Sequence, residues 1–254
     1  MGGDNAPEAN LLGAYLAYKE LDSNEKIVLV GDTKLANQWF SSNKIDSSVF
    51  DFIHANEVIH MNEHATKALR KKPNNSISVG FQALKNKEID VFSSSGNSGA
   101  MLVGSMFSIG PVKGVIRPGI TSILPKENGG VGLILDIGVN ADCKPDVLFQ
   151  FAILGSLFAE NVYNIKNPKV GLLNIGEEKG KGNLLTQATY QLLEDNDDIN
   201  FIGNVEGRDL FNDKADVIVC DGFTGNVVLK LAESFYSLIN QKNICLLYTS
   251  DAAD

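Results

Sequence analysis

Short apolar runs alternate along the chain with longer stretches in which apolar residues recur at helical spacing. The short runs are rich in Val, Ile and Leu, which is typical of strands that are covered on both faces of a sheet. They predict strands at residues 27–30, 49–53, 91–93, 120–124, 133–136, 170–173, 200–202 and 217–220. The longer stretches predict helices at residues 7–21, 64–72, 76–87, 99–109, 145–162, 182–194 and 225–239.

This alternation predicts an α/β fold with three α/β/α layers and a mainly parallel sheet. The polar stretch 41–48 is expected to be a surface loop, and no linker rich in Pro or Ser divides the chain. We therefore expect a single α/β catalytic domain over residues 1–244. Residues 245–254 break off a helical pattern and are expected to be a non-native tail. Because Gly2 and Gly3 follow Met1 with no strand before them, the domain is expected to be truncated at both ends.

Composition and charge narrow the class of protein. Hydrophobic residues make up 44% of the chain and charged residues 21%, as in ordinary globular enzymes. The formal net charge of -9 disfavours a nucleic-acid partner. The three cysteines show no CxxC spacing, and their odd number argues for a reducing compartment. With no apolar run long enough for a membrane span and no signal-peptide pattern, we expect a cytoplasmic protein.

Four loops that contain glycine stand between a predicted strand and a predicted helix. Backbone N–H groups at helix N-termini bind anions, and ligands of α/β sheets bind at the carboxyl ends of strands. Four such loops at one sheet edge would form a shared anion pocket, to which Lys179 and Lys181 add positive charge. The alternative is that the glycines only make tight turns. The sequence has neither a Walker A motif nor GxGxxG. The loops are residues 94–100, 136–145, 174–183 and 221–226.

Metal sites have only weak signals. The segment from His60 to His64 fits the pattern HxxEH, but a third ligand is not identifiable, so a helix start is the favoured interpretation. Asp142 and Asp146 stand four residues apart and could share a helix face toward a divalent metal, although capping and solvated acidic residues are the simpler explanation. We expect no metal.

Nucleophile motifs are equally sparse. Cys143 and Cys220 are candidates by position alone, and neither has a histidine close by in the sequence. Cys220 ends an apolar strand and is expected to be a small core residue. The absence of GxSxG disfavours a serine hydrolase.

Two further segments allow two interpretations each. Lys67, Arg70, Lys71 and Lys72 form a basic cluster that is either a solvated helix face or a docking patch for an acidic partner. The almost wholly apolar segment 99–109 is either a core helix or the wall of an acyl-chain pocket.

Several motifs together resemble one family, the phosphate acyltransferases of fatty acid and phospholipid synthesis (PlsX type). His60 stands where an acidic residue is common in the family, and Val139 where Ala is preferred. The resemblance extends over roughly residues 1–242. Its motifs are residues 1–7, 58–71, 95–100, 136–145, 171–183, 203–209 and 220–226.

The resemblance implies the fold of the isocitrate and isopropylmalate dehydrogenases, which the phosphotransacetylases share. It implies a homodimeric cytoplasmic enzyme that can associate with the inner face of the membrane. The implied reaction moves a long-chain acyl group from the thioester of an acyl carrier protein to inorganic phosphate. This chemistry requires no cofactor and no metal, and the acidic carrier protein makes the basic cluster the expected docking site.

Roles for individual residues follow from the loops and the resemblance together. We expect Lys179, Lys181 and the backbone from Gly176 to Gly182 to hold phosphate. Three asparagines, Asn97, Asn140 and Asn226, are expected to orient phosphate or to donate to the oxyanion. A local ion pair is the alternative role for Glu206 and Arg208. The remaining residues expected to bind substrate or position loops are Asp4, Gly96, Ser98, Gly99, Gly138, Gly176, Gly180, Gly182, Glu206, Arg208 and Gly225.

Three rival functions stay open at this point. A phosphotransacetylase-like enzyme would use a coenzyme A thioester in place of the carrier protein. A decarboxylating dehydrogenase of the same fold would need a nicotinamide cofactor and a metal site, for which Asp142 and Asp146 are the only hint. A non-catalytic protein would bind acyl chains or a membrane surface without turnover.

Overall fold

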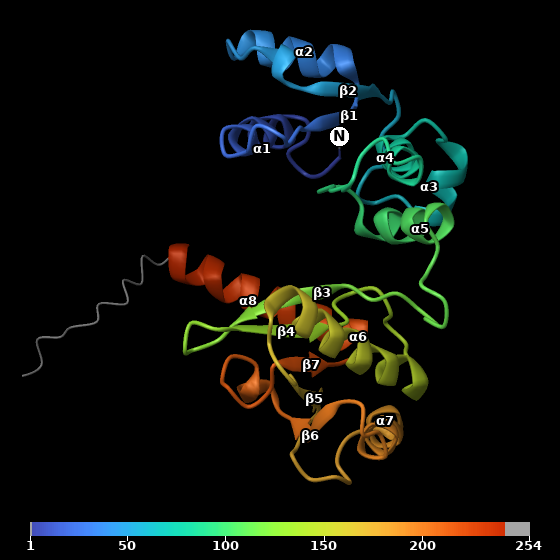
Figure 1. Cartoon of the computed structure of the whole chain (residues 1–254), viewed down its shortest axis with the longest axis vertical. Coiled ribbons are helices and arrows are strands. Elements are labelled where there is room, and N and C mark those ends of the chain that lie inside the picture. Colours follow the sequence, from blue (N-terminus) through green and yellow to red (C-terminus); the bar gives the residue numbers. More distant parts are fainter. Residues whose placement is uncertain (1, 242–254) are drawn as a thin grey trace, which may run out of the picture. The chain divides into compact units, whose positions relative to one another are not determined.

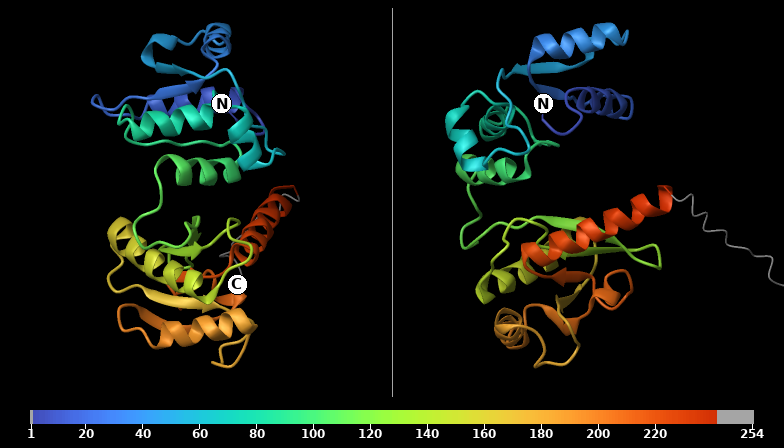
Figure 2. Two further views of the ribbon diagram at one scale, coloured as in Figure 1. Left: turned by 90° about the vertical axis from the view of Figure 1, so that its right-hand side faces the viewer. Right: turned by 180° about the vertical axis from the view of Figure 1, so that it is seen from behind.

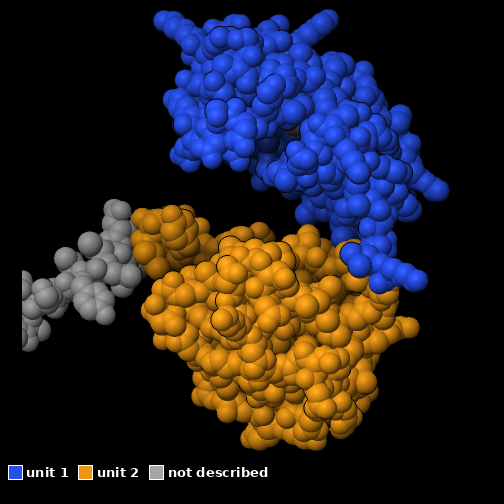
Figure 3. All heavy atoms as spheres, viewed as in Figure 1, with its two compact units in different colours: residues 1–113 blue, residues 114–254 orange. Residues whose placement is uncertain are grey.

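The computed structural model describes residues 2–241, which form two compact units (Figures 1 and 3). Unit 1 runs to Lys113 and unit 2 begins at Gly114. Each unit is described by itself.

Unit 1 contains a small parallel sheet and several helices. Strand β1 (Val28–Gly31) pairs in parallel with β2 (Asp51–His54). Leu11, Phe40 and Phe50 are buried between this pair and its helices, and a second cluster joins Ile77, Phe81 and Ala100. The helices of unit 1 are α1 (Glu8–Tyr18), α2 (Thr33–Ser42), η1 (Ser47–Val49), α3 (Ala65–Lys71), α4 (Ser76–Lys85) and α5 (Ser98–Ser108).

Side-chain caps fix where three of these helices begin. The Asp32 carboxyl group accepts hydrogen bonds from two N–H groups in the first turn of α2. Asn75 does the same for α4, and Asn97 accepts from Ala100 N in α5. A cap satisfies backbone donors that have no partner within the helix, so each of these polar residues sets the start of its helix.

Unit 2 is built on a five-stranded sheet with the order β3-β4-β7-β5-β6. The strands β4, β7, β5 and β6 are parallel, and β3 forms an antiparallel pair with β4 at one edge. The strands are β3 (Thr121–Pro125), β4 (Val131–Leu135), β5 (Lys169–Leu173), β6 (Asn200–Val205) and β7 (Val217–Val219). The helices are α6 (Pro145–Tyr163), α7 (Leu184–Glu194), η2 (Gly207–Asp209) and α8 (Gly222–Gln241).

Both faces of this sheet are covered, because successive strand residues point to opposite sides. Val217 and Val219 pack with α6 and α7, whereas Ile218 packs with Val228 of α8. Figure 2 shows α8 and α6 on opposite faces of the strands. The predicted α/β class with a mainly parallel sheet is confirmed, and unit 2 has the predicted three layers.

The elements of the structure differ from the predicted ones at three places. Residues 91–93 form no strand; within the described chain the apolar Phe92 instead packs edge-on against Phe81 of α4. Helix α2 was not predicted because its ten residues are mostly polar, and only Ala36 and Phe40 are buried. The stretch 41–48, predicted as a loop, includes the end of α2 and the start of η1. The predicted domain bounds of 1–244 stay a prediction, and the expected tail at 245–254 lies outside the described residues.

Gly225 allows α8 to begin directly against the end of β4. A Cβ atom added there would lie 1.9 Å from Asp136 O, which is far closer than non-bonded carbon and oxygen atoms can approach. We therefore expect Gly225→Ala to lower the free energy of unfolding by roughly 1–3 kcal/mol or more. Gly13→Ala in α1 is the matched control, because a Cβ atom there meets nothing within 4 Å. Urea denaturation measures both, and equal midpoints for the two variants would contradict this packing.

Candidate functional site

Four loops of unit 2 lie at the same edge of the sheet. They follow β4, β7, β5 and β6, which are parallel, so their carboxyl ends meet at one edge. Three of the predicted glycine loops, 136–145, 174–183 and 221–226, are therefore neighbours there. The fourth predicted loop, 94–100, was wrongly placed at this edge, because it belongs to unit 1 and follows no strand.

Asp136 organises the loop after β4, and the sequence analysis did not single it out. Its fully buried carboxyl group accepts hydrogen bonds from Asn140 N at 2.7 Å, Asn140 Nδ2 at 2.8 Å and Ile120 N at 3.0 Å. Asn140 Nδ2 also donates to Pro118 O at 2.9 Å. Both hydrogens of this amide are thus engaged within the fold, and Asn140 holds the loop in shape.

The start of α8 rests on this loop. Gly222 N donates to Asn140 O at 2.8 Å, and Asp221 caps the helix by accepting from Thr224 N at 2.8 Å. Gly138 has φ of +95°, and a Cβ atom on it would lie 3.2 Å from Asn226 Oδ1. The Asn226 side chain is exposed and makes no hydrogen bond to any residue between 2 and 241. Of the asparagines predicted as donors, Asn226 is the one whose amide is available.

The loop 174–183 is folded around Asn174. Its Nδ2 donates to Lys181 O and to Asn204 Oδ1, both at 3.1 Å, and its Oδ1 accepts from Ile175 N at 2.9 Å. Gly182 has φ of +95°, and a Cβ atom there would lie 2.1 Å from Thr186 Oγ1. Glycine is therefore required at this turn.

The backbone donors of this loop are mostly unused. Among the N–H groups of residues 176–182, Lys181 N alone finds an acceptor within the described chain, Glu178 O at 3.0 Å. Successive free N–H groups in a loop that precedes a helix are suited to binding an anion. The prediction that Gly176, Gly180 and Gly182 contribute to phosphate binding remains compatible with this geometry.

The two lysines of the loop differ in their surroundings. Lys179 forms an ion pair with Glu194 of α7 and lies 5.7 Å from the centre of the Tyr190 ring. The hydrogen bond that Lys179 donates to the Glu194 carboxylate raises the pKa of Lys179. The side chain of Lys181 is exposed and has no ion pair within residues 2–241. Lys181 is thus the lysine whose charge is available to a ligand.

Glu206 and Arg208 belong to an ion-pair network between two loops. Arg208 contacts Glu206 at 2.7 Å and Glu177 at 3.3 Å, and Lys214 contacts Glu177 at 2.8 Å and Asp209 at 2.9 Å. The alternative of a local ion pair for Glu206 and Arg208 is confirmed. The network ties the loop after β5 to the loop after β6. Because Arg208 is 70% exposed, its guanidinium group still faces solvent.

Asn97 has a structural role in unit 1. Its Oδ1 caps α5, and its Nδ2 donates to the carbonyl oxygens of His60, Met61 and Glu63 at 3.1–3.2 Å. The side chain is 7% exposed, and both amide hydrogens are used. Asn97 therefore fastens residues 60–63 to the start of α5.

The predicted residues next to Asn97 lie beside the first residues of the chain. Ser95 Oγ donates to Gly2 O at 3.0 Å, and a Cβ atom on Gly2 would lie 3.3 Å from the Cα of Gly96. Ser98 and Gly99 form the first turn of α5. The Asp4 side chain is exposed and makes no hydrogen bond within the described chain.

The basic cluster separates into two parts. Lys67, Arg70 and Lys71 are exposed on α3 and have no ion pair among residues 2–241. Lys72 instead donates to Val58 O at 2.7 Å and to Glu63 Oε2 at 2.6 Å. Lys72 thus belongs to the fold, and three free cations remain for docking.

The weak metal and nucleophile candidates gain no support. Glu63 of the HxxEH segment is engaged by Lys72 and by His60 N. Within residues 2–241, we find no cluster of three or more His, Cys, Asp or Glu side chains suited to a metal. Burial, with Asp136 and Asp221 nearby, raises the pKa of the Cys143 thiol to about 11, and burial also raises the pKa of Cys220. Both cysteines are therefore protonated at neutral pH and poor nucleophiles.

Helix α5 has one packed face and one exposed face. Ala100 and Gly104 are buried, as expected for a core helix, whereas Phe107 is 80% exposed. None of the helices among the described residues has the length and apolar character of a membrane span.

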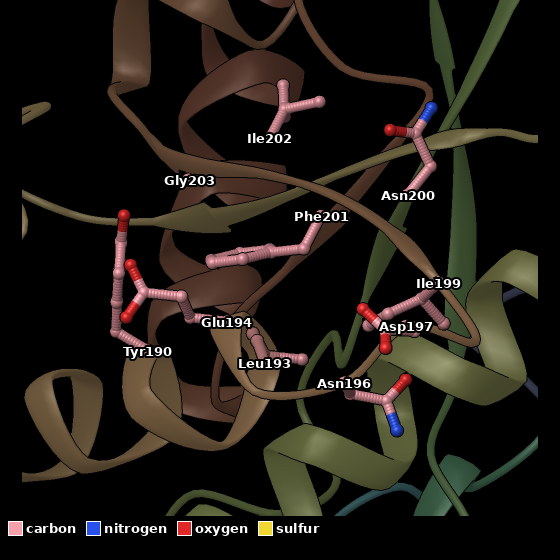
Figure 4. A pocket seen from close by; sticks show the side chains of 10 residues that line it. All are labelled: Tyr190, Leu193, Glu194, Asn196, Asp197, Ile199, Asn200, Phe201, Ile202 and Gly203. Atoms are coloured by element: carbon pink, nitrogen blue, oxygen red, sulfur yellow. The ribbon is translucent and has the colours of Figure 1, made fainter.

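A cavity of about 450 Å³ lies beside α7 and β6 in unit 2 (Figure 4). Tyr190, Glu194, Asp197 and Phe201 are among the side chains that line it. Its two carboxyl groups make it unsuited to an anion, and none of the predicted site residues lines it. This cavity is therefore not the anion pocket that the sequence predicts.

Comparisons with known proteins agree with this geometry. Residues 1–242 match the family model described as fatty acid synthesis protein. The chain is 46% identical over 233 residues to the phosphate acyltransferase of Dictyoglomus turgidum, covering 92% of this chain and 69% of the relative. It is 47% identical over an alignment of 257 residues to the phosphate acyltransferase of Acetivibrio thermocellus, covering 100% of this chain and 75% of the relative.

Solved structures show the fold. A phosphotransacetylase from Streptococcus pyogenes matches with a TM-score of 0.62 at 15% identity, covering 90% of this chain and 87% of that one. The EutD phosphotransacetylase from Staphylococcus aureus matches with a TM-score of 0.60 at 14% identity, covering 89% and 78%. The predicted relation to the phosphotransacetylase fold is confirmed.

Proposed function

Because the chain belongs to the fatty acid synthesis protein family, whose members similar to it are phosphate acyltransferases, we propose that it transfers an acyl group from an acyl carrier protein to inorganic phosphate. The family membership predicted from the sequence is confirmed. Acyl transfer to phosphate follows from the relatives at 46–47% identity. The carrier protein as acyl donor is the further step of the proposal.

The observation that supports this function is the edge of the unit 2 sheet. Free backbone N–H groups, the exposed Lys181 and the exposed Arg208 lie on adjacent loops there, next to the N-terminus of α8. Positive charge and free donors suit phosphate. Inorganic phosphate is already an anionic nucleophile at neutral pH, so an activated serine or cysteine is not needed.

The reaction needs one bond to form and one to break. A phosphate oxygen forms a bond to the thioester carbonyl carbon, which gives a tetrahedral oxyanion. The carbon–sulfur bond then breaks, and the carrier leaves as a thiol after gaining a proton. We assign the Lys181 side chain and the free N–H groups of residues 176–180 and 182 to phosphate, and Asn226 to the oxyanion. A donor to the oxyanion contributes about 3 kcal/mol to transition-state stabilisation.

The other predicted residues take supporting roles in this proposal. Asn97 and Asn140 position loops, because their amide hydrogens are engaged. Gly138 and Gly225 allow the close approach of α8 to the loop after β4. Lys179 ties the loop to α7 through its ion pair with Glu194. Asp4, Gly96, Ser98 and Gly99 remain candidates for substrate binding in unit 1.

The proposal includes partners and a location. Lys67, Arg70 and Lys71 form the docking patch for the acidic carrier protein. A homodimer is proposed as well, and the exposed apolar side chains of α8 at four-residue spacing, such as Phe223, Val227 and Leu231, offer a surface for it. We place the protein in the cytoplasm, with association at the inner face of the membrane.

An assay of acyl phosphate tests the function. The protein is incubated with a long-chain acyl carrier protein, with and without phosphate, and hydroxylamine traps the product as a hydroxamate. Phosphate-dependent hydroxamate with release of carrier thiol is the expected result. Equal or faster turnover of an acyl-coenzyme A would instead favour a phosphotransacetylase, and binding of acyl chains without turnover would favour a non-catalytic protein.

Lys181→Ala tests the phosphate site. Loss of a charge-assisted hydrogen bond is expected to raise the KM for phosphate about tenfold to a hundredfold, since such bonds contribute roughly 1.5–3 kcal/mol. Lys166→Ala is the matched control, because Lys166 is an exposed lysine of the same unit outside the edge loops. The assignment is wrong if both variants have the phosphate KM of the wild type.

The double variant Arg70→Glu/Lys71→Glu tests the docking patch. Reversing two charges is expected to raise the KM for the carrier substrate, with a smaller effect at high salt. The matched control, Lys85→Glu/Lys87→Glu, makes the same change of charge at exposed positions outside α3. The docking assignment is contradicted if the α3 variant keeps both the wild-type KM for the carrier substrate and the wild-type unfolding midpoint.

A further inference from the structure

Unit 1 contains its own cavity, of about 350 Å³, at the carboxyl ends of β1 and β2. Its wall includes Gly31 at the end of β1, Asp32 directly after it, residues 55–61 after β2, and residues 2, 3, 6 and 7 near the start of the chain. Ligands of α/β sheets bind at this end of the strands. The cavity thus occupies a position suited to a ligand, within a single compact unit.

Hydrogen bonds fix the walls of this cavity in place. Asn97 Nδ2 donates to the carbonyl groups of His60 and Met61, and Lys72 Nζ donates to the carbonyl group of Val58. Ser95 Oγ donates a hydrogen bond to Gly2 O. The cavity is therefore a formed feature of unit 1, and side chains far apart in the sequence maintain it.

The cavity lining is mainly apolar and partly uncovered. Leu35 is 42% exposed, Val58 37% and Met61 48%. Grouped apolar side chains that remain in contact with water gain free energy when a hydrocarbon covers them. The apolar residues of the lining are Ala6, Pro7, Leu35, Ala55, Val58, Ile59 and Met61.

The charges around the cavity disfavour an anion. Asp32 and Glu57 are its charged lining residues, and neither Lys nor Arg contributes to the lining. Both carboxyl groups are engaged, Asp32 as the cap of α2 and Glu57 with Asn74 N at 2.8 Å. The edge loops of unit 2 offer free cations and free N–H groups, whereas the charged groups that line this cavity are carboxyl groups with partners. It therefore suits an uncharged, apolar ligand.

The volume fits the hydrocarbon part of a fatty acyl group. If a methylene group occupies about the volume of a water molecule in the liquid, ~30 Å³, the cavity holds on the order of ten carbons. Pockets of this size are typical of small-molecule sites.

We propose that this cavity binds the hydrocarbon chain of the acyl substrate and sets the preference for chain length. The proposal rests on the acyltransferase function proposed above and adds the place of the chain. Each additional buried methylene is expected to improve binding about fourfold until the cavity is full.

Val58→Trp tests this assignment by filling the cavity from its rim. The value of kcat/KM is measured for carrier-bound acyl groups from four to sixteen carbons. We expect the long-chain value to fall at least tenfold relative to the four-carbon value. Met61→Trp fills the rim from a second position and covers the case in which the first variant folds poorly. Leu16→Trp is the control, because Leu16 is an exposed apolar residue of α1 that does not line the cavity.

Three outcomes separate this proposal from the proposed function. First, Val58→Trp and Met61→Trp could fold, retain turnover and keep the chain-length preference of the wild type. This outcome would overturn the cavity assignment and leave the acyltransferase function intact. An equal loss for all chain lengths would overturn it as well. If the wild type does not convert acyl carrier protein and phosphate to acyl phosphate, the proposed acyltransferase function is wrong. In that case the equilibrium binding of palmitate to the wild type and to Val58→Trp tests the cavity assignment independently of turnover, because the assignment requires weaker binding to the variant.

Discussion

The geometry of the unit 2 edge depends on the buried carboxyl group of Asp136. A carboxyl group without access to water needs hydrogen-bond donors, and Asp136 finds three, from Ile120 N and from the backbone and side chain of Asn140. Those bonds curl the chain after β4 into a tight loop, on which α8 begins. The glycine at position 225 permits this contact, since a Cβ atom there would clash with the carbonyl oxygen of Asp136. Asn226 lies at the edge because Asp136 shapes the loop after β4 and because Gly225 lets α8 begin against that loop.

The sequence predicts this fold well wherever a segment's own pattern decides its structure. Strands β4 and β7 of unit 2 are continuous apolar runs, as expected for strands that are buried on both faces. Residues 91–93 (Val-Phe-Ser) are also short and largely apolar but form no strand. A strand needs a neighbouring strand to pair with, and composition contains no information about neighbours. Helix α2 shows the opposite case, in which a polar segment becomes helical through the Asp32 cap and the burial of two apolar side chains.

Side-chain roles in the candidate site were less predictable than the positions of the loops. Asn97, Asn140 and Asn226 occupy similar places in glycine-containing loops, so the sequence treats them alike. Burial separates them: the first two are 7% and 8% exposed and use their amide hydrogens inside the fold, whereas Asn226 is exposed. Lys179 and Lys181 differ in the same way, because Glu194 of α7, fifteen residues along the chain from Lys179, lies close enough to pair with it. Contacts between such segments are set by the tertiary fold.

The two substrates of an acyl transfer to phosphate place opposite demands on a protein. Phosphate needs donors and positive charge that remain free in the empty site, and the edge loops of unit 2 leave N–H groups, Lys181 and part of Arg208 without partners. A hydrocarbon chain needs apolar surface with every polar group already satisfied, and around the unit 1 cavity Asp32, Glu57 and the carbonyl groups of residues 58, 60 and 61 all have partners. A single pocket cannot meet both demands, because cations free to bind phosphate would lose hydration when an acyl chain covered them. Separate binding regions for the anion and the chain, as we propose for this protein, would meet both demands.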